Sequence, residues 1–158
     1  MTETANSPAV VIDANILIAI CSREENTFKK AKAALDEYAQ QGAVFFAPNV
    51  LVAEVLFVLC QKAANGILTP TEHLIAVESF QEYLLIILPP PNGESALIDR
   101  AEKSRQGFGC SRTSDGLYIA LAEELAAAYQ VEFLTLDNDL KNQISKVNPQ
   151  VSINNLSL

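Results

Sequence analysis

The segment from Val50 to Cys60, VLVAEVLFVLC, constrains the fold more than any other part of the sequence. Ten of its eleven residues are apolar, the exception is Glu54, and Asn49 just before the segment marks a helix start. The pattern predicts a helix buried on most of its surface. A carboxylate there loses hydration unless a basic partner, a retained proton or a bound cation compensates. Lys62 is the only basic residue nearby and lies eight positions away, so the partner of Glu54 must come from elsewhere in the fold.

The composition is that of an ordinary globular protein. The chain has 158 residues, of which 49% are hydrophobic and 19% charged, so it is long enough for one domain with a proper core. We expect a polar tail over residues 1–8 and a single domain over residues 9–158. The formal net charge of −8 argues against a protein that binds nucleic acid through a broadly positive surface.

The cysteines and the first residues of the sequence indicate the cellular compartment in which the protein resides. Cys21, Cys60 and Cys110 are odd in number, far apart and without metal-site spacing, which favours a reducing environment over a disulfide framework or a zinc site. The first residues, MTETANSP, lack the basic start and apolar core of a signal peptide, and no apolar run is long enough to span a bilayer. We therefore expect a soluble, cytoplasmic protein without a membrane partner.

Short apolar runs alternate with helical patterns along the whole chain. That order favours an α/β fold, with a parallel sheet and helices on both faces. The segment beginning Thr69-Pro70-Thr71-Glu72 has the signature of a capping box at a helix start. The predicted strands are 9–12, 43–47, 84–88, 132–136 and 151–153, and the predicted helices are 16–20, 24–41, 50–64, one from 69 onward, 94–106, 115–129 and a short one around 140–144.

Four acidic residues stand where predicted strands end or helices begin. Asp13 directly follows the first strand and Asp137 the fourth, while Asp115 begins a helix and Glu54 lies on the helix after the second strand. Because ligands bind at the carboxyl ends of open parallel sheets, all four acids can reach one edge. Helix capping explains Asp13 as well as function does, a favourable helix dipole suffices for Asp115, and capping with a first-turn acid suffices for Asp137 and Asp139. Only Glu54, in mid-helix, resists such an explanation.

Taken together, the acids point to a divalent cation. Three or more carboxylates at one locus raise one another's pKa, and a hard cation removes that cost. Carboxylates and water are the ligands of Mg²⁺ or Mn²⁺, whereas zinc would require histidine or cysteine at a useful spacing. The single histidine, His73, lies in the helix that begins at Thr69, and a surface or half-buried position explains it better than catalysis does.

The ordered motifs resemble those of the PIN-domain nucleases, and among them the VapC-like toxins of type II toxin–antitoxin pairs. The ending FLTLDNDL is the most telling of these motifs. One departure is Gly116, because an alanine is more usual after the third acid, and glycine weakens a helix start. The matching segments are VVIDANILIAI (10–20), PNVLVAEVLFVL (48–59), SDGLYIALAEEL (114–125) and FLTLDNDL (133–140).

The resemblance implies a three-layer α/β/α fold around a central parallel sheet of about five strands, with an acidic Mg²⁺ or Mn²⁺ site that cuts RNA. It implies that the four acids above are both catalytic and metal-binding, in the order of the chain. It also implies a homodimer and a small antitoxin partner. The positions that match the family's pattern are Asp13, Glu54, Asp115 and Asp137, with Asp139 as an accessory metal ligand and Asn15 and Ser114 as supporting polar residues.

The predicted function is a metal-dependent endoribonuclease that acts as a toxin. Arg112, three residues before Asp115, is the best placed cation for an RNA phosphate, with Lys103, Arg105 and Lys141 as weaker candidates. The alternative from another class is a catalytically silent PIN-like module that binds RNA or a protein. A haloacid-type phosphatase is disfavoured, because Asp13 is followed by Ala14-Asn15 and the DxDx[TV] pattern is absent. A receiver-like domain is disfavoured, because no lysine follows the fourth predicted strand before Lys141.

Overall fold

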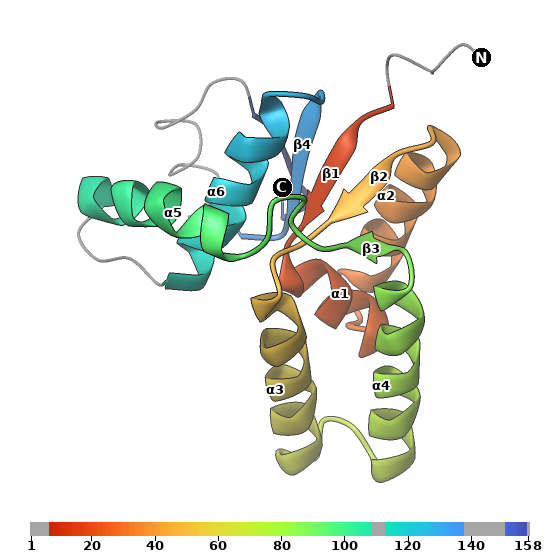
Figure 1. Ribbon diagram of the computed structural model, residues 1–158. Helices are drawn as coiled ribbons and strands as arrows, with labels where there is room; N and C mark the ends of the chain where they lie inside the picture. The colour runs from red at the N-terminus through yellow and green to blue at the C-terminus, as the bar shows by residue number, and fades with distance from the viewer. Residues whose placement is uncertain (1–6, 109–112, 138–150, 158) are drawn as a thin grey trace.

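The central sheet of the protein is parallel throughout, as a computed structural model of the chain shows (Figure 1). The model describes residues 7–108, 113–137 and 151–157, without the side chains of 104–108, 113 and 114. The strands are β1 (Ala9–Ile12), β2 (Val44–Phe46), β3 (Ile87–Leu88), β4 (Val131–Thr135) and β5 (Ser152–Asn155), and they lie in the order β3-β2-β1-β4-β5.

Helices connect the strands, which confirms the predicted α/β fold with a central parallel sheet of five strands. In Figure 1, α5 and α6 lie on the left beside the sheet, while α3 and α4 form a hairpin that extends downward from it. The helices in the described residues are α1 (Ala14–Cys21), α2 (Phe28–Gln40), α3 (Val50–Ala64), α4 (Pro70–Leu84), α5 (Ser95–Phe108) and α6 (Thr113–Ala126).

The central strand fixes where a ligand can bind. All four residues of β1 are at most 1% exposed, and the strand pairs with β2 on one side and with β4 on the other. The chain winds outward from β1 through β2 to β3 and then returns to β4 and β5, so the winding direction reverses between β1 and β4. Ligands of open α/β sheets bind beyond the carboxyl ends of the strands at such a switch point.

The capping box predicted for residues 69–72 is present at the start of α4. The Glu72 backbone N–H donates to Thr69 Oγ1 at 3.1 Å, and the Thr69 backbone N–H donates to Glu72 Oε2 at 2.7 Å. Pro70 occupies the first turn, where a missing N–H costs nothing. The local sequence therefore fixes this helix start.

Two predictions about buried elements are wrong. The sequence predicts that helix α3 is buried on most of its surface. The helix buries Leu51, Val55 and Leu59, but the side chains of Leu56 and Phe57 on its other face are 40% and 63% exposed. An apolar sequence alone does not say how many neighbours surround a helix. The strand predicted at 84–88 is an edge strand of two residues, because α4 continues to residue 84 and the chain turns before Ile87–Leu88.

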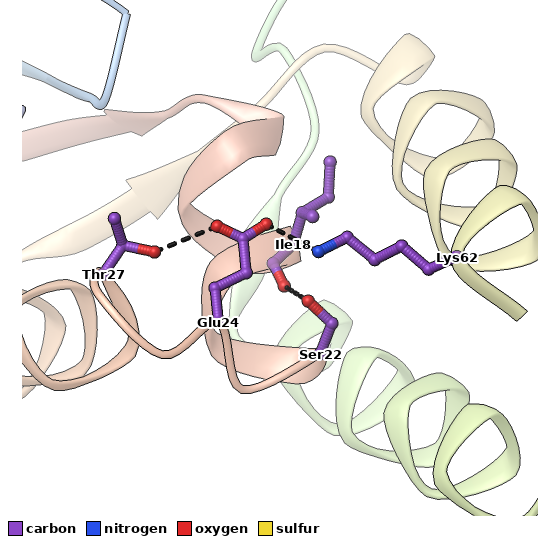
Figure 2. Close-up of polar contacts among 5 residues, drawn as sticks. All are labelled: Ile18, Ser22, Glu24, Thr27 and Lys62. Atoms are coloured by element: carbon purple, nitrogen blue, oxygen red, sulfur yellow. Dashed lines mark hydrogen bonds and ion pairs between the residues drawn. The ribbon is translucent and has the colours of Figure 1, made fainter. Parts of the chain in front are cut away.

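Lys62, the basic residue nearest to Glu54 in sequence, has a different partner (Figure 2). Its Nζ lies 2.8 Å from Glu24 Oε1, and Thr27 Oγ1 donates to Glu24 Oε2 at 3.0 Å. The lysine side chain is only 17% exposed, so this ion pair ties the end of α3 to the connection between α1 and α2. Lys62 consequently gives no charge compensation to Glu54.

The predicted short helix around residues 140–144 lies outside the described residues. In the part of the chain that the structure does describe, no helix combines the length and apolar content that a bilayer crossing requires.

Candidate active site

Asp13 lies at the carboxyl end of β1 and at the N-cap position of α1. Its side chain makes no capping hydrogen bond, and it is only 9% exposed. Its backbone N–H continues the sheet by donating to the Leu134 carbonyl at 3.0 Å. The geometry therefore removes the capping explanation for the Asp13 carboxylate, whose oxygens face the neighbouring strand.

Neutral donors surround the Asp13 carboxylate. Thr135 Oγ1 donates to Asp13 Oδ2 at 2.8 Å, and Asn15 Nδ2 donates to the same oxygen at 3.1 Å. The Asn15 amide also bridges to β4, since its Oδ1 accepts the Leu136 N–H at 3.1 Å and its Nδ2 lies 3.4 Å from Thr135 Oγ1. The predicted supporting residue Asn15 thus locks the start of α1 to the end of β4.

Glu54 is half-buried, on the second turn of α3, and its partner is a phenol. Tyr118, on α6, donates its hydroxyl to Glu54 Oε1 at 3.0 Å. Burial raises the pKa of Glu54, the hydrogen bond from Tyr118 lowers it, and the negative charge of Asp115 raises it further. The partner of Glu54, which the sequence left open, is therefore the neutral hydroxyl of Tyr118, and it does not cancel the negative charge of the carboxylate.

Three of the predicted acids influence one another. Burial raises the pKa of Asp13 to about 7, against hydrogen bonds from Thr135 and the Ala14 backbone, and the charges of Glu54 and Asp115 raise it further. In the described residues, neither Asp13 nor Glu54 pairs with a lysine or arginine. Within the described residues, β1, α3 and α6 therefore come together around negative charge at Asp13 and Glu54 that no described basic side chain neutralises.

Asp137 lies beyond the end of β4, beside the same network. Its backbone N–H donates to Thr135 Oγ1 at 2.9 Å, and its carbonyl accepts from Asn155 Nδ2 at 3.3 Å. Thr135 therefore joins Asp137 to Asp13 through one hydroxyl. Lys103 is exposed on α5. Asp139, Arg112 and Lys141, with the side chains of Ser114 and Arg105, lie outside the described residues.

Sequence reasoning missed two polar residues of the site. Thr135 is fully buried at the last position of β4, and nothing distinguishes it in sequence from an ordinary β-branched strand residue. Tyr118 had a usable signal: it follows Asp115 by three positions, which places both side chains on neighbouring parts of one helix face. A hydroxyl in a helix of alanine and leucine, so close to an acid, could have been singled out.

The donor set suits a hard cation. The side chains at the site offer carboxylate, hydroxyl and amide oxygens, which Mg²⁺ and Mn²⁺ prefer, and neither histidine nor cysteine. In the described residues, no three acidic, histidine or cysteine side chains are gathered closely enough to hold a metal ion. The oxygen donors at the site fit a hard divalent cation in chemical type.

These observations define a class: a parallel α/β protein with an acidic site at the switch point of its sheet. The PIN domain family model matches residues 10–144, and the chain belongs to that family. PIN domains are generally nucleases, and PIN nucleases generally use divalent metal ions.

A solved structure shares the fold. The crystal structure of FitAcB from Neisseria gonorrhoeae matches with a TM-score of 0.61 over 92% of this chain and 96% of that chain, at 16% sequence identity. A comparison with curated protein sequences finds no match.

Proposed function

We propose that this chain is a metal-dependent endoribonuclease, with Asp13, Glu54, Asp115 and Asp137 as its acidic site. The observation that carries the proposal is the electrostatic influence of Asp13, Glu54 and Asp115 on one another near the switch point, with raised pKa values for Asp13 and Glu54 and no basic partner for either in the described residues. Without such a partner, these acids are compensated by a retained proton or by a bound cation, and a bound cation would serve both.

The same residues would hold Mg²⁺ or Mn²⁺, with Asp139 as a further ligand. The bound ion would lower the pKa of a water molecule and neutralise charge that develops on the phosphate. Thr135 and Asn15 orient the Asp13 carboxylate through hydrogen bonds. Arg112 is our candidate for holding a substrate phosphate, and Ser114 for a supporting polar group.

The proposal is tested by incubating the purified full-length protein with a panel of tRNA, rRNA fragments and mRNA in Mg²⁺ and in Mn²⁺. We expect cleavage that EDTA abolishes and that Asp13→Asn and Asp115→Asn each reduce by at least about a hundredfold. Asp36→Asn is the matched control, because Asp36 is an exposed acid on α2, 3.1 Å from Lys32. Cleavage that survives both site substitutions would contradict the assignment of the site.

The alternative is a catalytically silent PIN-like module that binds RNA or a protein. It predicts Mn²⁺ binding that Asp13→Asn weakens, together with intact RNA across the whole panel. The net charge of −8 is the feature that favours it, because bulk RNA is repelled unless a local cation steers it. The cleavage assay separates the two functions, because only the nuclease produces RNA fragments.

We further propose that the protein is the cytoplasmic toxin of a toxin–antitoxin pair, on the basis of its resemblance to VapC-like toxins. The proposed antitoxin is a small DNA-binding protein encoded beside this gene. Expression of the chain alone should arrest growth, and co-expression of the neighbouring short reading frame should restore it. Arrest that persists with Asp13→Asn would contradict a toxic nuclease.

We also propose a homodimer, formed through an exposed face of α3 that consists of Val52, Ala53, Leu56, Phe57 and Cys60 and that we name the α3 apolar face. Val52, Leu56 and Phe57 are 38%, 40% and 63% exposed, and Ala53 and Cys60 are exposed as well. None of the five is charged, although the chain carries a net charge of −8. Two copies can therefore meet on this face without opposing their carboxylates.

A further inference from the structure

Tyr118 lies on α6 and contacts Glu54, the acid of the proposed site that lies within α3. Its side chain is fully buried, and its hydroxyl donates to Glu54 Oε1 at 3.0 Å. The two residues are 64 positions apart in sequence, so the contact depends on how α3 and α6 pack. Among the described residues, Tyr118 is the side chain that donates a hydrogen bond to the Glu54 carboxylate.

The Tyr118 ring is held in place by the sheet. It packs edge-to-face on Phe133 of β4, with ring centroids 6.2 Å apart and an interplanar angle of 84°. Phe133 is itself fully buried, so neither ring has room to turn aside. The hydroxyl is consequently presented to Glu54 from a fixed position.

The phenol can act only as a donor toward the acids. Burial raises the pKa of Tyr118, and the negative charges of Glu54 and Asp13 raise it further. Because its pKa lies above the ordinary value of 10.0, the phenol is protonated at neutral pH and can donate to Glu54. Loss of the contact is unfavourable, because the buried hydroxyl then lacks its side-chain acceptor.

We propose that Tyr118 is a positioning residue that fixes the Glu54 carboxylate for metal binding. The hydroxyl engages Oε1, so Oε2 would remain available to a bound cation. Residues that orient a metal-binding side chain through its second polar atom reduce metal affinity when they are removed. The inference rests on the proposed metal site, and it adds a residue that neither the sequence nor the family match assigns.

The test is Mn²⁺ titration by calorimetry on the full-length protein, its Tyr118→Phe variant and a Tyr38→Phe control. Phenylalanine keeps the ring and its contact with Phe133, so only the hydroxyl is lost. The control removes a tyrosine hydroxyl from a hydrogen bond of equal length, 3.0 Å from Asn154 Nδ2, in another part of the protein. We expect Tyr118→Phe to weaken Mn²⁺ binding by about 10- to 100-fold and Tyr38→Phe to leave it unchanged.

A double-mutant cycle separates positioning from a general effect on the fold. In a Glu54→Ala background, Tyr118→Phe should cause no further loss of Mn²⁺ affinity, because the carboxylate that it positions is gone. Equal affinity of Tyr118→Phe and the unaltered protein would overturn the inference. So would a loss of the same size in both backgrounds, since the hydroxyl would then act on something other than Glu54.

The same titration distinguishes the two proposals. If the unaltered protein does not bind Mn²⁺, the proposed metal site fails and the role of Tyr118 fails with it. If the unaltered protein binds and Asp13→Asn weakens binding while Tyr118→Phe does not, the metal site stands and only the positioning role is lost.

Discussion

At the scale of single residues, the acidic site is built from carboxylates and neutral donors. The Asp13 carboxylate, 9% exposed, accepts hydrogen bonds from a threonine hydroxyl and an asparagine amide, and Glu54 accepts one from a tyrosine. Such donors satisfy oxygen atoms but leave the charge, which is why burial and mutual repulsion still raise the pKa of both acids. The arrangement favours any ligand that supplies positive charge.

The raised pKa of Asp13 predicts how stability depends on pH in the absence of metal. Between the ordinary value of 3.8 and about 7, the folded protein retains a proton at Asp13 that the unfolded chain has lost. The free energy of unfolding should therefore fall as pH rises through this window. Urea denaturation at several pH values in EDTA measures the slope.

Asp13→Asn is the control for this prediction, because it removes the titrating group and should flatten the fall between pH 4 and 7. Added Mn²⁺ should restore stability to the unaltered protein at pH 7, where the carboxylate is exposed to its full electrostatic penalty. A slope that is the same in the variant would show that Asp13 does not control it.

At the scale of elements, the start of α6 is placed by its contact with α5. Gly116 follows Asp115, and a Cβ added there would lie 3.4 Å from the Ala101 carbonyl oxygen and 3.5 Å from the Ala101 Cβ. These are ordinary contact distances, so the packing against α5 has room for a methyl group at this position. The contact with α5 therefore does not require the departure from the alanine of the family pattern.

Gly116→Ala should stabilise the protein by about 0.5–1 kcal/mol, since alanine restricts the unfolded chain and the added methyl group meets α5 at contact distance. Urea denaturation measures the change. Gly66→Ala is the matched control and should destabilise by about 1 kcal/mol, because Gly66 has a φ of +72° that alanine rarely adopts. Destabilisation by Gly116→Ala would mean that α5 leaves no room for a methyl group.

The capping box of α4 provides a second prediction at this scale. Thr69→Ala removes the hydroxyl that accepts the Glu72 N–H, and we expect a loss of about 1 kcal/mol in the free energy of unfolding. Mn²⁺ affinity should not change, because α4 contributes none of the proposed ligands. Thr71→Ala is the control, because Thr71 lies two positions after Thr69 and does not belong to the capping box. It should lower the free energy of unfolding by less than half as much.

At the scale of the whole molecule, one exposed helix face carries no charge. The α3 apolar face has no charged residue, although the chain carries a net charge of −8. An uncharged face of that kind is where two strongly acidic copies can approach each other.

Phe57→Asp should convert the proposed dimer into a monomer, because it places a carboxylate at the centre of the α3 apolar face in both copies. Light scattering after gel filtration at micromolar concentrations measures the mass. Leu74→Asp is the matched control, since Leu74 is 59% exposed on α4 against 63% for Phe57, and it should leave the dimer intact. A monomeric unaltered protein would contradict the proposed interface.

The sequence by itself determined the order of strands and helices and predicted the acids of the candidate site. Strand–helix alternation predicted the parallel sheet, the Thr69 box predicted a helix start, and acids at strand ends predicted where charge collects, because capping, periodicity and chain direction act over a few residues. Tertiary packing decided the rest. The Tyr118–Glu54 and Thr135–Asp13 contacts span 64 and 122 positions, and the number of neighbours around α3 and the length of β3 depend on elements far away in the chain. No local pattern specifies such pairings, since their energy exists only once the helices and strands have packed.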